Sequence, residues 1–395
     1  MPSIAIIGAS LSGLRSAEAA VRANFDGEIY VFGDEPYPPY NRPPLSKEAL
    51  EHDSPIDGVL LRTSFRDRIS YELSRKVIQA DLNTNTLTFF DGKKIAVDGI
   101  IAATGLRSRS LSVPKPSNGV FSLRSYDDMT TIRRALSPHA HVIIIGAGFI
   151  GCEVGATLTK MGHRVTIIAP ESVPMMRPLG IKVGRALQAH HAKQGVTFAL
   201  DRMPTEISGV DAPQGVLCND GSFFEADLVI EAIGSIPNTE WLEGNDLDLD
   251  NGVLCDTTLR AGSNGTLFAT GDIARFPNLR FDATPRRVEH WGIAVDSGRY
   301  AGKALATILR GEPLLDEFSP MPAFWSDQFL IRIQSFGMPG LVSDESSISV
   351  LDGDLESEVA VGYFRDDILV GVVLIGFGAQ HTKYRDSIGK SKAEL

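Results

Sequence analysis

Two glycine-rich turns of nearly the same sequence constrain how this chain can fold. The first lies in IIGASLSGLRSAEAAV, residues 6–21, and the second in IIIGAGFIGCEVGATL, residues 143–158. Each turn follows a short apolar run and precedes a stretch with small residues at helical spacing, which is typical of a strand–turn–helix unit. One such turn is a weak signal, but two in the same context predict two dinucleotide-binding units in one chain.

The small residues of each turn have separate tasks. Gly8 allows the tight bend, Ser10 lets the backbone approach a pyrophosphate, and Gly13 lets the helix pack closely on the sheet. The helix start also offers free N–H groups and a positive dipole end to the phosphates. The second turn repeats this pattern with Gly146, Gly148 and Gly151.

Acidic residues and strand ends add to the pattern. Asp34 and Glu35 follow the strand EIYVF, where a carboxylate can accept hydrogen bonds from an adenosine ribose. Three apolar runs stop at or near a glycine, as expected where strand ends meet a ligand: they end at Gly105, Gly234 and Asp272. Asp272 either holds ribityl hydroxyls or simply belongs to a turn. The pair of nucleotides that suits a redox enzyme is a flavin and a nicotinamide dinucleotide.

Composition excludes several other classes of protein. The 395 residues, with 43% apolar and 22% charged content, suit two or three globular domains. No apolar run reaches the roughly 18 residues of a membrane span, and no secretory leader precedes the first strand. A net charge of -11 argues against nucleic-acid binding, and no His/Cys cluster predicts a metal. Three widely spaced cysteines favour the cytoplasm.

Longer motifs appear in order along the whole chain, and together they carry a family resemblance. They are GDEPYPPYNRPPLSK (33–47), AATG (102–105), SLRSYDD (122–128), GAGFIGCEVGA (146–156), ATGDIARFPN (269–278) and RVEHWGIAVDSGRYAGKAL (287–305). The chain resembles the FAD-dependent NAD(P)H:ferredoxin reductases of oxygenase systems, the putidaredoxin reductase-like group of glutathione-reductase-type flavoproteins. The RPPLSK and RVEHW stretches are far more specific than the glycine turns.

The resemblance implies an α/β fold with two Rossmann-like domains and a C-terminal α+β domain. The expected boundaries are 1–110 and 236–315 for the FAD domain, 111–235 for the inserted NAD(P) domain, and 316–395 for a β-rich domain that covers the flavin. In this last domain EVAVGYF and ILVGVVLIG, joined by RDD, predict a pair of strands.

The implied activity is hydride transfer from NAD(P)H onto FAD and release of single electrons to a two-iron ferredoxin. That ferredoxin would serve a haem monooxygenase or a Rieske dioxygenase. The resemblance places Arg42 on the cofactor and Lys47 near flavin N5, paired with Glu153. Glu153 lies in the first turn of a helix that should meet phosphates, so a neighbouring cation would offset its repulsion.

Further cofactor contacts are expected around both nucleotides. The stretch EHWG (289–292) should precede a helix that begins near Ile293, and this helix start would stabilise an anionic reduced flavin ring. Trp291 is otherwise a core residue, and for Trp325 the flavin and core interpretations are equally good. The expected flavin-side residues are Ala103, Thr104, Gly105, Arg124, Asp272, Glu289, His290, Trp291 and Trp325, and those on the nicotinamide side are Phe149, Ile150, Glu171 and Gly234.

The residues that follow the strand RVTII predict which nicotinamide nucleotide the chain prefers. Relatives commonly have an acid there for the ribose 2′-hydroxyl, whereas this chain has Ala169 and then Glu171. Glu171 has the same offset from its strand as Glu35 has from EIYVF, so it is expected to substitute. NADH is therefore predicted, while NADPH stays open because Arg164 or Arg177 would suit a 2′-phosphate.

An acidic ferredoxin needs a basic docking patch on this acidic chain. Two arginine-rich segments are candidates, although single arginines are more often simply solvated. They hold Arg275, Arg280, Arg286, Arg287 and Arg299, and Arg62, Arg66 and Arg68. The chain is expected to be a monomer or a homodimer.

Three alternatives stay open. A rubredoxin or monodehydroascorbate-type reductase would share nearly every motif. A peroxide- or disulfide-reducing flavoenzyme would need a reactive cysteine such as Cys152, which a packing role explains better. A non-catalytic flavoprotein signalling module would rely on basic surfaces, which the net charge disfavours.

Overall fold

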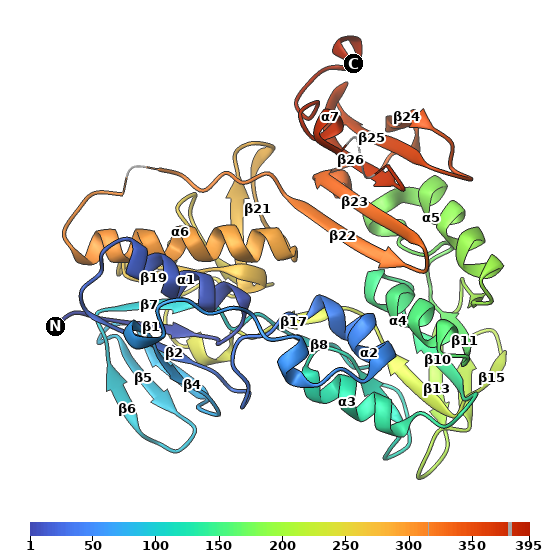
Figure 1. The fold of residues 1–395 in the computed structure, drawn as a ribbon, viewed down its shortest axis with the longest axis horizontal. Coiled ribbons are helices and arrows are strands. Elements are labelled where there is room, and N and C mark those ends of the chain that lie inside the picture. The colour runs from blue at the N-terminus through green and yellow to red at the C-terminus, as the bar shows by residue number, and fades with distance from the viewer. Residues whose placement is uncertain (315, 378–380) are drawn as a thin grey trace. The chain divides into compact units, whose positions relative to one another are not determined.

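The computed structural model describes residues 1–314, 316–377 and 381–395. Contacts group them into two compact units. Unit 1 comprises Met1–Asn41, Val59–Arg107 and Ile236–Ala323, and unit 2 comprises Arg42–Gly58, Ser108–Ser235 and Phe324–Leu395. The division into three domains stays a prediction. The elements of both units are labelled in Figure 1.

Unit 1 is built on a five-stranded sheet in which every neighbouring pair is parallel, with the order β19-β7-β1-β2-β3. Its strands are apolar and fully buried at the centre, as parallel strands covered on both faces must be. They span Ser3–Ile7 (β1), Glu28–Phe32 (β2), Ser70–Glu72 (β3), Gly99–Ala102 (β7) and Leu267–Ala269 (β19).

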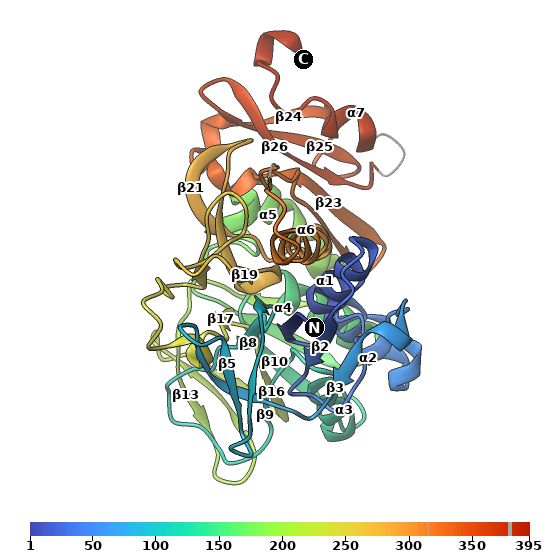
Figure 2. The same cartoon turned by 90° about the vertical axis from the view of Figure 1, so that its left-hand side faces the viewer.

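Two helices of unit 1, α1 (Leu11–Arg22) and α6 (Trp291–Leu309), lie side by side against this sheet, as Figures 1 and 2 both show. Small residues make their contact possible: a Cβ added at Gly302 would lie 2.0 Å from the Ser16 carbonyl oxygen. Smaller elements complete the unit. They are β4 (Val77–Asp81), β5 (Thr86–Phe89), β6 (Lys94–Ala96), β18 (Val253–Leu254), β20 (Ala274–Asn278), β21 (Asp282–Arg287), η3 (Arg66–Arg68), η4 (Glu240–Leu242) and η5 (Gly271–Ile273).

Unit 2 repeats the same design with a second parallel sheet, in the order β12-β11-β10-β16-β9. The strands span Thr197–Ala199 (β12), Arg164–Ile168 (β11), His141–Ile145 (β10), Leu228–Glu231 (β16) and Val120–Ser122 (β9). An antiparallel three-stranded sheet accompanies it: β13 (Pro204–Ser208), β14 (Gly215–Cys218) and β15 (Phe223–Glu225). Outside this unit's two sheets, the short strands β8 (Leu106–Ser108) and β17 (Ser235–Pro237), which lie mostly in unit 1, pair with each other.

The helices of unit 2 begin at recognisable signals. Ser125 and Asp128 form a reciprocal capping box at the start of α3, which fixes that helix start from the sequence alone. Gly180 interrupts α5 with a φ of +79°. The helical elements are η1 (Pro43–Ser46), α2 (Glu48–His52), η2 (Ile56–Gly58), α3 (Tyr126–Ala135), α4 (Phe149–Lys160) and α5 (Met176–Lys193).

A five-stranded sheet, ordered β22-β23-β26-β25-β24, forms the C-terminal part of the chain. The predicted strand pair is confirmed: β25 and β26 run antiparallel. Asp366 and Asp367 join them with φ values of 52° and 60°, as a two-residue hairpin turn requires. The elements are β22 (Ala323–Gln328), β23 (Ile331–Gly337), η6 (Pro339–Leu341), η7 (Glu345–Ser347), β24 (Ile348–Gly353), β25 (Val359–Arg365), β26 (Ile368–Ile375), α7 (His381–Arg385) and η9 (Lys392–Glu394).

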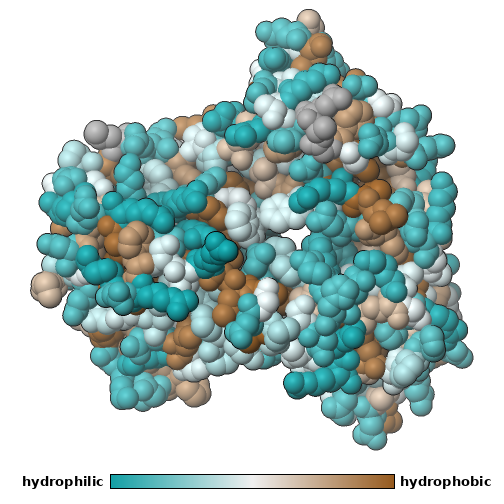
Figure 3. Space-filling view, viewed as in Figure 1, coloured by the Kyte–Doolittle hydropathy of each residue, from teal (hydrophilic) through white to brown (hydrophobic). Residues whose placement is uncertain are grey.

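In the part of the chain that the structure describes, no helix is long and apolar enough to cross a membrane. Hydrophilic residues predominate on the face drawn in Figure 3, and apolar ones are scattered among them. The three cysteines are free and buried.

Candidate active site

The two glycine turns have matching geometry. Gly8 has a φ of +122° and Gly146 a φ of +111°, both in a region that favours glycine. A Cβ at Gly8 would lie 2.1 Å from the Ala103 carbonyl oxygen, and one at Gly146 would lie 2.3 Å from that of Ala232. Each turn therefore lets its strand–helix connection sit directly against the end of the neighbouring strand.

Each turn leads into a helix whose first backbone N–H groups receive no side-chain cap. Ser10 precedes α1 and Gly148 precedes α4, and neither helix start receives a side-chain capping hydrogen bond. A Cβ at Gly148 would meet nothing within 4 Å. A small, open position beside free helix N–H groups is a cradle that fits the pyrophosphate of a dinucleotide.

The strand ends of unit 1 bring several predicted residues together. Tyr40 donates a hydrogen bond of 2.5 Å to Glu35, whereas Asp34 forms an exposed ion pair with Lys76 at 2.9 Å. The Thr104 hydroxyl donates to the Asn238 carbonyl oxygen at 2.7 Å. Glu35 is thus held in place next to the first turn's sheet, and Asp34 lies out at the surface.

Asp272 lies in η5, beside a buried chain of hydroxyl groups. Ser12 and Thr270 are 2.7 Å apart through their hydroxyl oxygens, and Thr270 donates to Ser297 at 2.8 Å. These bonds connect α1, η5 and α6. Arg287 donates to the Asp272 carbonyl oxygen at 3.1 Å, and therefore also helps to fix this turn.

The EHW stretch leads into α6 as predicted, although the helix begins at Trp291, two residues before the expected start. His290 occupies the N-cap position, and burial lowers the pKa of its imidazole to about 4. The Trp291 indole donates to Asn41 at 3.0 Å. Glu289 forms an ion pair with Arg287 at 2.8 Å.

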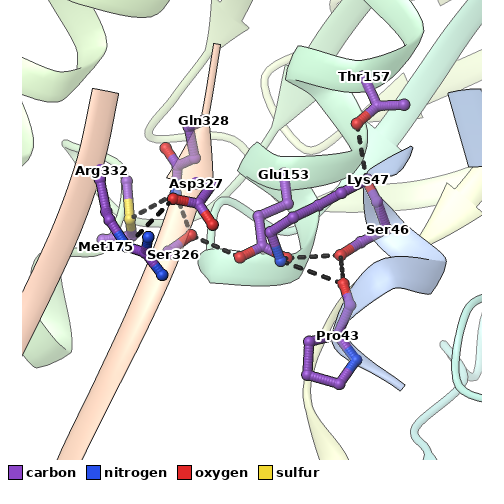
Figure 4. A network of polar contacts seen from close by, with 10 residues as sticks. All are labelled: Pro43, Ser46, Lys47, Glu153, Thr157, Met175, Ser326, Asp327, Gln328 and Arg332. Carbon is purple, nitrogen blue, oxygen red and sulfur yellow. Dashed lines mark hydrogen bonds and ion pairs between the residues drawn. The ribbon is translucent and has the colours of Figure 1, made fainter. Parts of the chain in front are cut away.

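In unit 2 the structure places Lys47 and Glu153 in direct contact. Their ion pair measures 2.7 Å, with the side chains only 14% and 5% exposed. The Ser46 hydroxyl donates to the same carboxylate oxygen at 2.5 Å, and Ser326 donates to the other oxygen at 2.5 Å (Figure 4). The predicted pair is therefore confirmed as a contact. Removal of Lys47 would leave the buried Glu153 carboxylate without its counter-ion, which is costly.

Other predicted residues of unit 2 lie as follows. Arg42 donates to the Arg124 carbonyl oxygen at 2.7 Å, so these two are neighbours. Phe149 packs edge-on against Phe324, with ring centroids 4.8 Å apart, while Ile150 next to it is 45% exposed. Trp325 is half-buried, with the Arg332 guanidinium 6.0 Å from the centre of its ring.

The end of β11 carries the residues expected to select the nicotinamide nucleotide. Ala169 is fully buried, so it presents no polar group. Glu171 forms an ion pair with Arg177 at 3.2 Å, and Arg177 itself is 82% exposed. Gly234, after β16, has a φ of +97° and open space where a Cβ would be.

Comparison with known proteins agrees with this geometry. The model of the pyridine nucleotide-disulphide oxidoreductases matches residues 2–298, and a reductase C-terminal model matches residues 323–394. The chain belongs to the pyridine nucleotide-disulphide oxidoreductase family. The predicted α/β fold and the assignment as an oxidoreductase are thereby confirmed.

Individual members of this family resemble the chain over nearly its whole length. Rhodocoxin reductase from Rhodococcus erythropolis is 32% identical, covering 97% of this chain and 88% of the relative. Rubredoxin-NAD(+) reductase from Pseudomonas putida is 32% identical over 85% of this chain and 86% of its own. The covalent putidaredoxin reductase–putidaredoxin complex has a TM-score of 0.90 at 28% identity, covering 99% of this chain and 93% of that one. The resemblance to reductases of oxygenase systems is confirmed.

The family's name refers to a disulfide, whereas the three cysteines of this chain are unpaired and buried. Cys152 is fully buried, and desolvation raises the pKa of its thiol. Such a thiol stays protonated near neutral pH and is a poor nucleophile. This favours the packing role predicted for Cys152. Among the described residues, no group of side chains could hold a metal ion.

The sequence does not single out several polar residues of the site. Ser46, Ser326, Gln328 and His191 are all buried around Glu153, yet serine, glutamine and histidine are too common to single out by type. Ser46 lies within the RPPLSK motif and Ser326 follows Trp325 directly, so the sequence signals mark their neighbourhood. The sequence indicates Arg287 only as part of a docking patch, whereas its side chain is 10% exposed and donates to the Asp272 carbonyl oxygen.

Proposed function

We propose that the chain is a flavoprotein NAD(P)H:ferredoxin reductase that serves a haem monooxygenase or a Rieske dioxygenase. The observation that carries the proposal is the pair of matching glycine turns, one on each parallel sheet. A single chain with two pyrophosphate cradles suits an enzyme that binds FAD and a nicotinamide dinucleotide together. Bound FAD would accept two electrons as a hydride and release them one at a time.

The FAD would be held by the first glycine turn, by Arg42 and by the further flavin contacts predicted from the sequence. Gly8, Ser10 and Gly13 would receive the pyrophosphate, and Glu35 would accept hydrogen bonds from the adenosine ribose. Asp34 is the weaker candidate, because Lys76 already occupies it. The remaining flavin contacts proposed are Ala103, Thr104, Gly105, Arg124, Asp272, Glu289, His290, Trp291 and Trp325.

The nicotinamide nucleotide would bind at the second turn, formed by Gly146, Gly148 and Gly151. Phe149, Ile150 and Gly234 would line its path, and Glu171 would accept the ribose 2′-hydroxyl. The ion pair with Arg177 holds that carboxylate in place, which supports NADH. A 2′-phosphate would have to displace Glu171 from Arg177 first.

We expect NADH to be the better substrate for this reason. Steady-state kinetics with both nucleotides measure the preference, and Glu171→Gln should reduce the ratio of the NADH to the NADPH specificity constants. Arg185→Gln, an exposed residue elsewhere on α5, is the control. A large NADPH preference in the unaltered protein would contradict the assignment of Glu171.

Lys47 and Glu153 are proposed to act on the flavin ring as a pair. The ammonium group of Lys47 is held by Glu153 and by the Pro43 carbonyl oxygen at 3.2 Å, so its position is well defined. A fixed cation can stabilise the charge that the ring gains during reduction without any rearrangement.

The electron acceptor is proposed to be an acidic two-iron ferredoxin docking on an arginine-rich face. Four of the five arginines in 275–300 already have carboxylate partners, which lowers their attraction for a partner protein. Arg62, Arg66 and Arg68 are exposed and are therefore the better candidates. The protein is further proposed to be a monomer or a homodimer in the cytoplasm. Its free cysteines suit such a reducing compartment.

A direct test is to purify the protein and measure its absorption spectrum, then its NADH-dependent reduction of cytochrome c with candidate ferredoxins. We expect bound FAD and an activity that requires the ferredoxin. Protein that stays colourless after incubation with FAD would refute the proposal.

A second candidate is a rubredoxin reductase, because rubredoxin-NAD(+) reductase has the same identity to this chain, 32%, as rhodocoxin reductase, over 85% rather than 97% of the chain. The two differ only in the acceptor. Parallel assays with a rubredoxin and a two-iron ferredoxin decide between them by their specificity constants.

A further inference from the structure

A buried chain of polar side chains continues from Glu153 away from Lys47. The Ser326 hydroxyl lies 2.5 Å from Glu153 Oε1, and Gln328 Nε2 lies 2.9 Å from the Ser326 hydroxyl. His191 Nε2 lies 2.7 Å from Gln328 Oε1. Figure 4 shows the part from Glu153 to Gln328, and all three added side chains are almost completely buried. Three elements, α4, β22 and α5, each supply a member.

The chemistry of these groups gives the chain one direction. An ionised carboxylate can only accept, so the Ser326 hydroxyl must donate its single proton to Glu153. Ser326 then accepts from the amide nitrogen of Gln328, which leaves the Gln328 carbonyl oxygen facing His191. That oxygen needs a donor, and only the tautomer of His191 with a proton on Nε2 provides one.

His191 is suited to this fixed role. Burial lowers the pKa of His191 to about 4, so the imidazole is neutral near pH 7. Its other nitrogen, Nδ1, is buried and has no hydrogen-bond partner among the described residues. The rings of Phe198 and Phe329 lie 6.0 and 5.1 Å from the His191 ring centre and confine it. The histidine therefore holds one tautomer and one orientation.

We propose that Ser326, Gln328 and His191 are positioning residues that orient the carboxylate of Glu153 toward Lys47 through one directed chain of hydrogen bonds. The hydrogen-bond chain makes strand β22 of the C-terminal sheet part of the proposed site, because Ser326 and Gln328 are alternate residues of that strand. Its effect on hydride transfer rests on the proposed function; the directed chain itself does not.

The directed hydrogen-bond chain predicts that a substitution at Glu153 changes the tautomer of His191. Glu153→Gln removes the obligatory acceptor, so the amide of Gln328 is free to turn over and His191 is free to place its proton on Nδ1. Ser326→Ala breaks the chain at its centre with the same consequence. Nitrogen-15 NMR of labelled histidines reports the tautomer, and His191→Gln assigns the signal.

Matched variants separate positioning from general damage. Ser326→Thr keeps the hydroxyl and should keep the tautomer of His191. Ser335→Ala removes another buried hydroxyl of the same sheet, one without a hydrogen-bond partner in the described chain, and should change nothing. An unchanged tautomer in both Glu153→Gln and Ser326→Ala, or an equal change in Ser335→Ala, would overturn the proposal.

The functional arm uses the FAD-loaded protein in stopped-flow reduction by NADH. Ser326→Ala should lower the limiting rate about tenfold while leaving the apparent dissociation constant of NADH unchanged, and Ser326→Thr should restore the rate. A shifted tautomer with an unchanged rate would overturn the claim that the chain positions the reacting pair. A protein that binds no FAD would refute the proposed function, while the NMR result would still decide the hydrogen-bond chain.

Discussion

At the scale of single residues, the pairing of Lys47 with Glu153 is the most informative result. The family resemblance predicted this pair, and a carboxylate at a phosphate-binding helix start made a nearby cation favourable. The structure places Lys47 2.7 Å from Glu153. The surrounding hydroxyl groups of Ser46 and Ser326 were not foreseen, because their position depends on packing from distant parts of the chain.

Replacing Lys47 should therefore harm both stability and reaction. Lys47→Ala leaves Glu153 buried without its counter-ion, which should lower the free energy of unfolding by about 3 kcal/mol. We expect flavin reduction by NADH to slow by about tenfold to a hundredfold. Urea unfolding and stopped-flow absorbance measure the two effects.

The control for Lys47 is Lys160→Ala, which removes a much more exposed ion pair with Glu51. Exposed pairs contribute less than about 1 kcal/mol, so this variant should resemble the unaltered protein. Unchanged reduction rates in Lys47→Ala would reject a role for Lys47 at the flavin.

At the scale of elements, close approach between helices matters more than helix propensity. Glycines of α6 face backbone atoms of α1, and Gly302 is the tightest of these contacts. The same two helices flank the hydroxyl chain of Ser12, Thr270 and Ser297, so their separation also sets the turn that carries Asp272.

Gly302→Ala should force α1 and α6 apart. Its Cβ would lie 2.0 Å from the Ser16 carbonyl oxygen, and relieving such overlap costs about 1–3 kcal/mol. We expect a lower urea midpoint and weaker FAD retention, measured by fluorescence of released flavin. Gly340→Ala, where a Cβ meets nothing within 4 Å, should leave both unchanged. Equal behaviour of the two variants would contradict the tight helix contact.

Acid should lower the free energy of unfolding, because the fold buries His191 as a neutral imidazole. Its pKa falls from 6.5 in the unfolded chain to about 4 in the fold. Between these values the unfolded state binds more protons, so stability decreases as pH falls, by about 3 kcal/mol in total. Urea unfolding at a series of pH values should show a shallower decline in His191→Gln than in the exposed-site control His52→Gln. Parallel curves would argue against a buried neutral His191.

At the scale of the whole molecule, electrostatics would govern the proposed docking of an acidic ferredoxin on this acidic chain. The net charge of -11 is repulsive, so association must rely on local basic groups. Exposed arginines at 62–68 are available for this, whereas most of those at 275–300 are neutralised within the fold.

Ferredoxin reduction should therefore slow as ionic strength rises, because salt screens docking at the arginine face. Arg66→Gln combined with Arg62→Gln should lower the rate at low salt by up to about tenfold and flatten the salt response. Reduction of a small neutral quinone, which needs no docking, is the control. A flat salt response in the unaltered protein would contradict electrostatic docking.

The sequence alone determined the fold class, the two dinucleotide cradles and the C-terminal hairpin. These depend on local signals, such as glycines that permit a bend and apolar runs of strand length, which act over a few neighbouring residues. Tertiary structure decided what surrounds Glu153 and which arginines are already paired. Those contacts join residues more than a hundred positions apart, and only the packed chain brings a serine of β22 to a carboxylate of α4.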